Sequence, residues 1–277
     1  MALKKYLERI SASSASHASI VCMGIDPIIE KIPLKKENIE EKIFSFYSSI
    51  LDSNPRVCAI KPNYAFFAQY GFDGLRALKR IIDSYKKTYP VILDAKRSDI
   101  GKTSEAYAKE VFLFWGADAT TVSPYLGSDT IKPFLLYKTN FSYVLCRTSN
   151  DSAREFQSLK SANLPLYLHV ARKVQELDAS RGLLGLVVGA TAPLELEKIA
   201  STLRKPKLPL LIPGIGAQRG DLKKTMQILK KHYRERTSIC LINASSSISY
   251  AYAKENAADY VGSALKEIDN LNRQIKL

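Results

Sequence analysis

The feature that most constrains the fold of this chain is the regular alternation of short apolar runs with amphipathic segments. Segments such as NIEEKIFSFYSSIL and GFDGLRALKRIIDSYKK have the apolar spacing of helices, and the runs between them have the length of buried strands. This alternation predicts parallel strands joined by right-handed crossovers. Eight such units in 277 residues predict a closed (β/α)8 barrel. The eight expected strands are Ile20–Ile25, Val57–Lys61, Val91–Asp94, Ala119–Val122, Tyr143–Arg147, Leu184–Gly189, Pro209–Pro213 and Ile239–Asn243.

No low-complexity linker divides the chain, so residues 1–277 are expected to form a single domain. The widest interval between expected strands, residues 150–182, is expected to hold a loop followed by the helix PLYLHVARKVQEL. The chain has no run of about 18 apolar residues, so no membrane span is expected. Its first residues also lack the long apolar stretch of a signal peptide. A cytoplasmic location is therefore the default expectation.

The cysteines and histidines do not indicate a metal site. Each of the four cysteines lies inside an apolar stretch, and no two form a C-x-x-C pair. We expect them to be buried small hydrophobic residues rather than disulfide partners or ligands. With three histidines in the chain, a His-rich metal site is not expected either.

The net charge of +14 suggests a nucleic-acid-binding protein as an alternative class. The basic residues, however, are scattered over helical segments such as LKKTMQILKKHYRER, in which Leu222, Met226, Leu229 and Tyr233 share one face. No zinc-finger spacing or RNP-like aromatic motif accompanies the charge. We therefore expect solvated helix faces and no nucleic acid, although salt-dependent retention on DNA would favour the alternative. A positive field can also attract small anions such as phosphate esters.

Polar residues follow the apolar core of nearly every expected strand. In (β/α)8 barrels the active site lies at the carboxyl ends of the strands. A polar cluster after nearly all eight strands predicts a ring of side chains that converge on one mouth. These clusters are Asp26, Lys61, Asp94, Ser123, Thr148-Ser149, Thr191, Gly214–Gln218 and Asn243–Ser247.

The stretch VILDAKRSDIGKT places four charged residues at the end of the third expected strand. Strand alternation puts Asp94 and Lys96 on the same side, and Lys61 at the end of the second strand reaches the same space. Asp99 falls in the following loop. A salt-bridge network that only stabilises the barrel is the alternative, but such a set at two adjacent strand ends favours catalysis. Arg97 and Lys102 are expected to be solvated.

The same stretch resembles a known motif. DAKRSDIGKT is similar to the D-x-K-x-x-D-I-x-x-T motif of the orotidine 5′-phosphate decarboxylase family, and its surroundings resemble the longer-loop, type 2 branch. The further matching stretches, in the family's order between residues 20 and 265, are MGIDP, IKPNYAFFAQYGFDGL, TVSPYLGSD, VLCRTSN, GLVVGAT and PGIGAQRGD.

The resemblance implies a homodimeric carboxy-lyase of pyrimidine biosynthesis. It would convert orotidine 5′-monophosphate to UMP and carbon dioxide without a cofactor or a metal. Fusion or association with orotate phosphoribosyltransferase is also implied, because some members of the family are joined to it.

The resemblance further implies roles for individual residues. The catalytic tetrad would be Lys61, Asp94, Lys96 and Asp99. Asp99, together with Ile100 and Thr103, would complete the active site of the neighbouring subunit. Asp26 and Lys61 would hold the ribose hydroxyls with Asn63 nearby, and Ser149 would read the pyrimidine edge. Pro213 and Gln218 belong to the implied phosphate loop.

Elementary electrostatics favours Lys96 as the cation that acts on the substrate. Loss of carbon dioxide leaves negative charge on one ring carbon, which an adjacent ammonium can stabilise and then protonate. At about 4 Å and an effective dielectric constant of about 20, the attraction is about 4 kcal/mol. That energy corresponds to roughly a thousandfold in rate.

The chain departs from the family pattern after the eighth expected strand. The family has an arginine that clamps the phosphate, and this chain has Ser246 in its place. Either phosphate binding is impaired, so that the barrel binds nucleotides without efficient turnover, or Arg219 has taken over. A magnesium-dependent sugar-phosphate decarboxylase or aldolase of the same superfamily is the other alternative. That alternative needs an extra acidic ligand set near the mouth of the second strand, where this chain has Lys61-Pro62-Asn63 instead.

Overall fold

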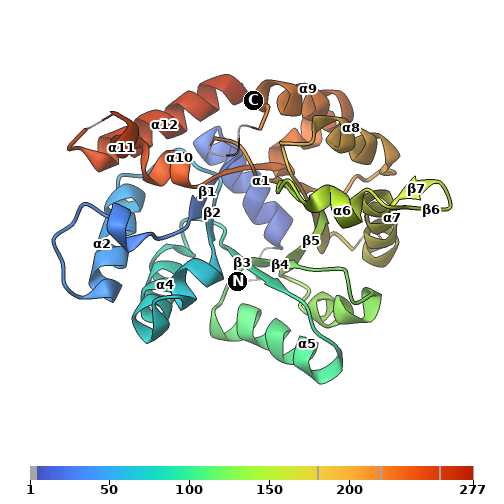
Figure 1. Ribbon diagram of the computed structural model, residues 1–277, viewed down its shortest axis with the longest axis horizontal. Coiled ribbons are helices and arrows are strands. Elements are labelled where there is room, and N and C mark those ends of the chain that lie inside the picture. The colour runs from blue at the N-terminus through green and yellow to red at the C-terminus, as the bar shows by residue number, and fades with distance from the viewer. Residues whose placement is uncertain (1–4, 180, 217, 219, 256, 277) are drawn as a thin grey trace.

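The computed structural model describes residues 5–179, 181–216, 218, 220–255 and 257–276. Eight parallel strands form one sheet around the centre of the molecule, and helices surround them (Figure 1). The predicted (β/α)8 architecture is therefore confirmed. The strands are β1 (Val21–Ile25), β2 (Ala59–Pro62), β3 (Ile92–Arg97), β4 (Ala119–Val122), β5 (Phe141–Arg147), β8 (Leu184–Val188), β9 (Leu210–Ile212) and β10 (Leu241–Ala244).

The sheet closes next to the expected catalytic residues. Its strand order is β2-β1-β10-β9-β8-β5-β4-β3, which leaves β2 and β3 at the two ends. Two parallel bridges join those ends, Ile60 with Val91 and Asn63 with Asp94. Because Asn63 pairs with Asp94, the segment just after β2 lies beside the second half of β3 at the carboxyl end of the barrel.

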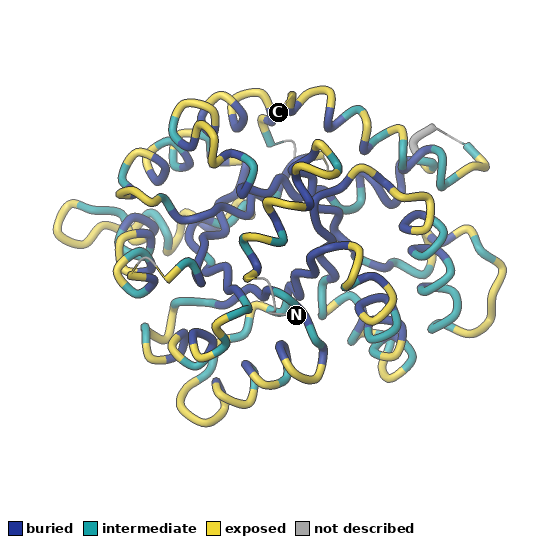
Figure 2. Tube along the Cα trace, turned by 180° about the vertical axis from the view of Figure 1, so that it is seen from behind, coloured by how far each residue is buried: buried dark blue, intermediate teal, exposed yellow. Residues whose placement is uncertain are grey.

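The helices cover the outside of the barrel, and the buried residues concentrate between them and the strands (Figure 2). Short 3-10 turns and one π-helical turn, Glu110–Phe114, interrupt the connections, and β6 (Lys160–Ser161) pairs with β7 (Leu164–Pro165) in a small hairpin. The helices are α1 (Tyr6–His17), α2 (Ile39–Asp52), α3 (Tyr64–Ala68), α4 (Gly71–Tyr85), α5 (Gly101–Lys109), α6 (Ala153–Gln157), α7 (Leu166–Asp178), α8 (Pro193–Thr202), α9 (Leu222–Tyr233), α10 (Ser246–Ser249), α11 (Ala251–Glu255) and α12 (Tyr260–Ile275).

Helix α1 closes the amino end of the barrel. Tyr6 and Ile10 are fully buried in a cluster with interior residues of the strands, and the Tyr6 ring stacks on Phe141 at 4.9 Å. The Ser13 hydroxyl donates to the Cys58 carbonyl, just before β2. With its amino end covered in this way, the barrel is open to a ligand at its carboxyl end.

Several details differ from the sequence-based expectations. Strand β3 continues to Arg97 rather than ending at Asp94, because the chain resumes pairing with β4 after a local irregularity. Strand β10 begins at Leu241, because Arg234–Ile239 forms a 3-10 helix. The four cysteines are buried and free, as predicted. On α9 the four apolar residues expected on one face are also buried.

Candidate active site

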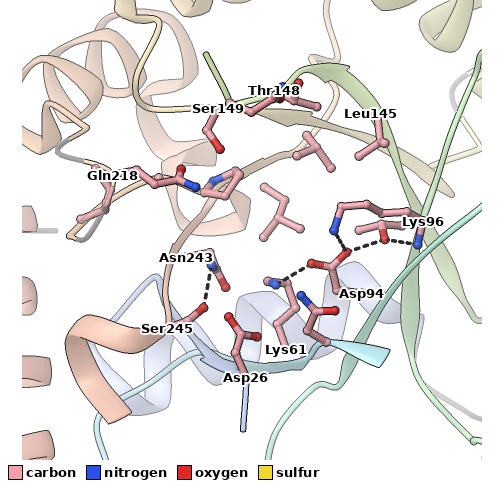
Figure 3. A pocket seen from close by; sticks show the side chains of 18 of the residues that line it. Asp26, Lys61, Asp94, Lys96, Leu145, Thr148, Ser149, Gln218, Asn243 and Ser245 are labelled. Carbon is pink, nitrogen blue, oxygen red and sulfur yellow. Dashed lines mark hydrogen bonds and ion pairs between the residues drawn. The ribbon is translucent and has the colours of Figure 1, made fainter. Parts of the chain in front are cut away.

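A cavity of about 470 Å³ opens at the carboxyl ends of the strands. Its wall combines charged, hydroxyl, amide and apolar side chains from most of the strand ends (Figure 3). The predicted convergence is therefore observed, except that Ser123 and Thr191 do not line the cavity. The lining residues are Asp26, Lys61, Asn63, Asp94, Lys96, Thr121, Leu145, Thr148, Ser149, Asn150, Val187, Leu211, Pro213, Gly214, Ile215, Gln218, Asn243, Ser245 and Ser246.

Asp94 is the centre of a charged array on one side of the cavity. Lys61 Nζ donates to its Oδ2 at 2.8 Å, and Lys96 Nζ donates to its Oδ1 at 2.8 Å (Figure 3). Burial by itself would raise the pKa of Asp94, but the two ammonium groups lower it below its ordinary value. Burial would likewise lower the pKa of Lys61, but the Asp94 and Asp26 carboxylates raise it. Asp94 and Lys61 are therefore both charged at neutral pH.

The two lysines differ in exposure. The Lys61 side chain is 5% exposed, whereas that of Lys96 is 51% exposed. Lys61 therefore acts as a fixed partner of Asp94, and Lys96 presents its ammonium to whatever fills the cavity.

Lys96 reaches Asp94 through an irregular backbone rather than through simple strand alternation. Its φ of +46° lies in the left-handed region, and the β3–β4 register shifts between Leu93 and Arg97. Thr121 on β4 holds this irregularity: its hydroxyl accepts from the Lys96 backbone N–H at 2.9 Å and donates to Asp94 Oδ1 at 2.8 Å. The expected proximity of Asp94 and Lys96 is thus found, with a different physical cause.

Two buried oxygens at the cavity are available to a ligand. Among the described residues, Asp26 Oδ1 and Asn243 Oδ1 have no hydrogen-bond partner although both are buried. Burial raises the pKa of Asp26, which the Lys61 ammonium partly offsets. Since unpaired buried acceptors are costly, these two oxygens indicate that a ligand with hydroxyl or amide donors completes the site.

Ser149 is held in place by its neighbours at the end of β5. Its carbonyl accepts from the Thr191 hydroxyl at 3.0 Å. A Cβ at Gly189 would lie 2.8 Å from the Ser149 Cα, so only glycine allows this approach. Gln157 also fixes Thr148 by accepting from its backbone N–H at 2.9 Å and donating to its hydroxyl at 2.8 Å. The polar edge of the cavity at Ser149 is therefore rigid.

The loop after β9 forms the side of the cavity across from Lys96. Gly214 and Gly216 have φ values of +99° and +89°, which favour glycine and turn the backbone sharply. Figure 3 shows Gln218 on this side, with Ser245 nearer to Asp26. Lys61 and Lys96 are the only cationic side chains that line the cavity within the part of the chain that the structure describes. Ser246 lines it as a neutral hydroxyl, and Arg219 lies outside the described residues.

Three expected site residues lie outside this cavity. Asp99 Oδ1 accepts from the Ile100 backbone N–H at 2.8 Å, at the start of α5. Ile100 is 61% exposed, and Thr103 is also exposed on the first turn of the same helix. Their implied role at the site of a neighbouring subunit stays a prediction.

Sequence reasoning missed several residues that build the site. The sequence places Thr121 only within an expected strand and does not distinguish the apolar lining residues Leu145, Val187 and Leu211 from other strand residues. The only available signal was strand periodicity, since Thr121 belongs to β4 and its side chain turns toward the same mouth as Asp94. A polar residue inside an apolar strand is a usable indicator of a site in a barrel.

Over the described ranges, no group of three or more His, Cys, Asp or Glu residues is arranged to hold a metal ion. No helix in those ranges is long and apolar enough to cross a membrane.

Comparison with known proteins identifies the family. Residues 21–261 match the model of the Orotidine 5′-phosphate decarboxylase / HUMPS family. The chain belongs to this family. The family expected from the sequence motifs is therefore confirmed, and with it, at the level of the family, the expected class of carboxy-lyase.

Individual relatives agree over nearly the whole chain. Orotidine 5′-phosphate decarboxylase of Verminephrobacter eiseniae is 40% identical, with 94% of this chain and 93% of that protein aligned. The enzyme of the same name from Cupriavidus necator is 41% identical over 97% of this chain and 98% of its own.

Solved structures give the same result. The structure of Leishmania donovani OMP decarboxylase superposes with a TM-score of 0.81 at 32% identity, covering 99% of this chain and 100% of that one. Leishmania donovani UMP synthase matches with the same TM-score and identity, but 98% of this chain corresponds to 57% of that longer chain.

Proposed function

We propose that this protein decarboxylates orotidine 5′-monophosphate to UMP and carbon dioxide, a step of pyrimidine biosynthesis. The observation that carries the proposal is the Lys61–Asp94–Lys96 array, in which one carboxylate bonds two ammonium groups at 2.8 Å at the edge of the cavity. The family membership supports the same reaction.

In the proposed mechanism Lys96 is both the cation and the proton donor. The bond between the pyrimidine ring and the carboxylate breaks, carbon dioxide leaves, and the bonding electron pair stays on the ring carbon. Lys96 Nζ stabilises that pair and then transfers its proton to the carbon. Asp94 lies against the substrate carboxylate and holds the Lys96 ammonium in place, while Lys61 fixes Asp94. Because the array is already assembled, little reorganisation is needed during the reaction.

The remaining lining residues support a nucleotide pose. The unpaired Asp26 oxygen and Lys61 would bind ribose hydroxyls, with Asn63 beside them. Ser149 would contact the pyrimidine edge. The phosphate would lie at the loop that contains Pro213 and Gln218, where backbone N–H groups are suited to an anion.

We also propose that two copies of the chain share their active sites. Asp99, Ile100 and Thr103 do not line the cavity of their own chain, and we propose that they complete the site of a partner copy. The likeness to UMP synthase also suggests that this chain works together with a phosphoribosyltransferase, either fused to it or associated with it.

A weakened phosphate site is the second candidate, and one observation favours it. The only cations in the described lining of the cavity are Lys61 and Lys96, and both bond Asp94, so an incoming phosphate dianion would have no cation of its own to bind. The protein would then bind nucleotides but turn them over slowly.

A direct assay tests these proposals. The purified protein is mixed with orotidine 5′-monophosphate in EDTA, and the absorbance change and the formation of UMP are followed. Metal-independent formation of UMP supports the decarboxylase. Activity only after magnesium is added would point to a magnesium-dependent sugar-phosphate relative, and binding without turnover would point to an impaired barrel.

A further inference from the structure

Arg97 follows Lys96 directly and, contrary to the expectation from sequence, is not solvated. Its side chain is only 15% exposed. Arg97 Nε donates to Glu110 Oε2 at 3.0 Å, and Nη2 donates to Glu110 Oε1 at 2.6 Å. This paired geometry is the strongest form of contact between an arginine and a carboxylate.

Aromatic rings enclose the same guanidinium. The Arg97 Cζ lies 4.4 Å from the centre of the Tyr64 ring and 4.6 Å from that of Tyr107. Trp115 Nε1 donates to Glu110 Oε1 at 2.9 Å, and its ring meets that of Tyr64 edge-on at 6.0 Å. We call these five residues the Arg97 clamp.

The clamp joins the three segments that carry the expected catalytic residues. Tyr64 begins α3 directly after Asn63, which is paired with Asp94 at the closure of the barrel. Tyr107 lies on α5, about two helical turns after Asp99. Glu110 opens the π-helical turn that continues α5, and such turns are common at functional sites.

Lys96 is the residue that needs this support. A non-glycine residue in the left-handed region is strained, and it persists only where its surroundings fix it. On the amino side of Lys96, Thr121 accepts from its backbone N–H at 2.9 Å. On the carboxyl side, the Arg97 carbonyl accepts from Ser123 N–H at 2.9 Å, and the Arg97 side chain is held by the clamp.

We propose that Arg97 is a positioning residue for the reaction, because the clamp fixes the left-handed backbone that delivers Lys96 Nζ to Asp94. This inference rests on the proposed decarboxylation. An arginine is required rather than any cation, since a lysine forms neither the paired contact with Glu110 nor the flat stacking between two rings.

The kinetic test compares Arg97→Lys with a matched control, Arg80→Lys. Arg80 lies on α4, where it stacks on Phe44 at 4.1 Å and bonds Glu40 and Glu41, but it does not line the cavity. A general loss of stability would act on both variants alike. We expect kcat of Arg97→Lys to fall at least about tenfold, since misplacement of a reacting group is costly. KM and the Kd for UMP should stay within about threefold, because ground-state binding is untouched.

Several kinetic results would overturn the inference. A kcat for Arg97→Lys equal to that of Arg80→Lys would show that the clamp does not position Lys96. A change confined to KM would show that Arg97 acts on substrate binding instead. Glu110→Gln should reproduce the fall in kcat, because it removes the partner that holds the guanidinium.

A crystal structure of Arg97→Lys separates this inference from the proposed function. We expect Lys96 to leave its left-handed conformation and its Nζ to move out of hydrogen-bond distance of Asp94. An unchanged Lys96 would overturn the inference even if the wild-type enzyme is active. Conversely, a wild-type protein that does not act on orotidine 5′-monophosphate would refute the proposed function, while this structure would still decide the role of the clamp.

Discussion

At the scale of single residues, the site depends on one buried carboxylate that satisfies two cations. Asp94 and Lys61 are both buried, and they are hydrogen-bonded to each other. Each charge is therefore compensated mainly by its partner rather than by water. Removing one member of a buried ion pair leaves an uncompensated charge, which costs more than the pair contributes. The residues proposed to organise catalysis therefore also determine part of the free energy of unfolding.

The variant Asp94→Asn should be destabilised by about 3 kcal/mol at pH 7, because it leaves Lys61 buried with a weaker partner. The pKa of Asp94 in the folded protein is lower than its ordinary value of 3.8. Its contribution to stability is therefore fully present above about pH 4 and is lost as the pH falls through the folded pKa. Urea unfolding of wild type and variant should give a difference that shrinks between pH 7 and pH 3.

The control for this prediction is Asp83→Asn, which removes a carboxylate that bonds Lys79 and Lys86 on the surface of α4. An exposed pair contributes at most about 1 kcal/mol. If Asp94→Asn costs no more than Asp83→Asn, or if its cost does not change with pH, the charged array is not the buried network described above.

The variant Ser246→Arg should raise kcat/KM for orotidine 5′-monophosphate by about ten- to a hundredfold, because a charged hydrogen bond contributes about 1.5–3 kcal/mol. Ser246→Gln, which adds length without charge, should give little of this gain.

If Arg219 already compensates, Arg219→Ala should cost at least about tenfold in the present chain and much less once Ser246→Arg is present. An unchanged or lower kcat/KM in Ser246→Arg would show that Ser246 does not lie at the phosphate.

At the scale of elements, the irregular pairing of β3 with β4 creates the reactive geometry. The shift in register after Leu93 allows Asp94 and Lys96 to converge, and Thr121 bonds both of them. A regular strand would also place the two side chains on one face. It would not allow the Thr121 hydroxyl to bond both the Asp94 carboxylate and the Lys96 backbone N–H.

The variant Thr121→Val keeps the shape of the side chain but removes its hydroxyl. We expect kcat to fall by about tenfold, or about 1.4 kcal/mol in the barrier, because Lys96 and Asp94 lose their shared contact. Thr120→Val is the matched control, since Thr120 is also buried on β4 but bonds the Leu93 carbonyl at 2.9 Å. Both variants should lose stability, whereas only Thr121→Val should lose kcat. Equal kcat values for the two variants would contradict this account.

The sequence predicted the elements better than it predicted this junction. Apolar periodicity located all eight strands, because a buried parallel strand requires a continuous apolar run. The bulge at Lys96 was not predictable, since neither Ala95 nor Lys96 is a residue that favours a left-handed backbone. The burial of Arg97 was missed for a related reason, because its partner Glu110 and its stacking rings come from three separate elements.

At the scale of the whole molecule, the barrel places its closing apolar cluster and its cavity at opposite ends. Helix α1 and the interior cluster close the amino end, while the polar lining residues meet at the carboxyl end. Asp99 and Thr103 are the exception, because they lie at the surface beyond their own cavity. In the proposed dimer, they complete the site of the partner copy.

Mixing two inactive variants tests this assembly. Asp99→Ala and Lys96→Ala should each be inactive, whereas a mixture that exchanges subunits should regain about a quarter of wild-type activity, because mixed dimers have one intact site. A mixture whose subunits demonstrably exchange without any gain in activity would show that the sites are not shared.

The most direct test of the central claim is the rate of decarboxylation of orotidine 5′-monophosphate by wild type and by Lys96→Ala, both in EDTA and both shown to be folded. We predict that the wild type forms UMP without added metal. Lys96→Ala should retain less than about a hundredth of its kcat, since the lysine supplies roughly a thousandfold in rate. A Lys96→Ala variant that keeps more than that fraction, or a wild type that is silent until magnesium is added, would contradict the account.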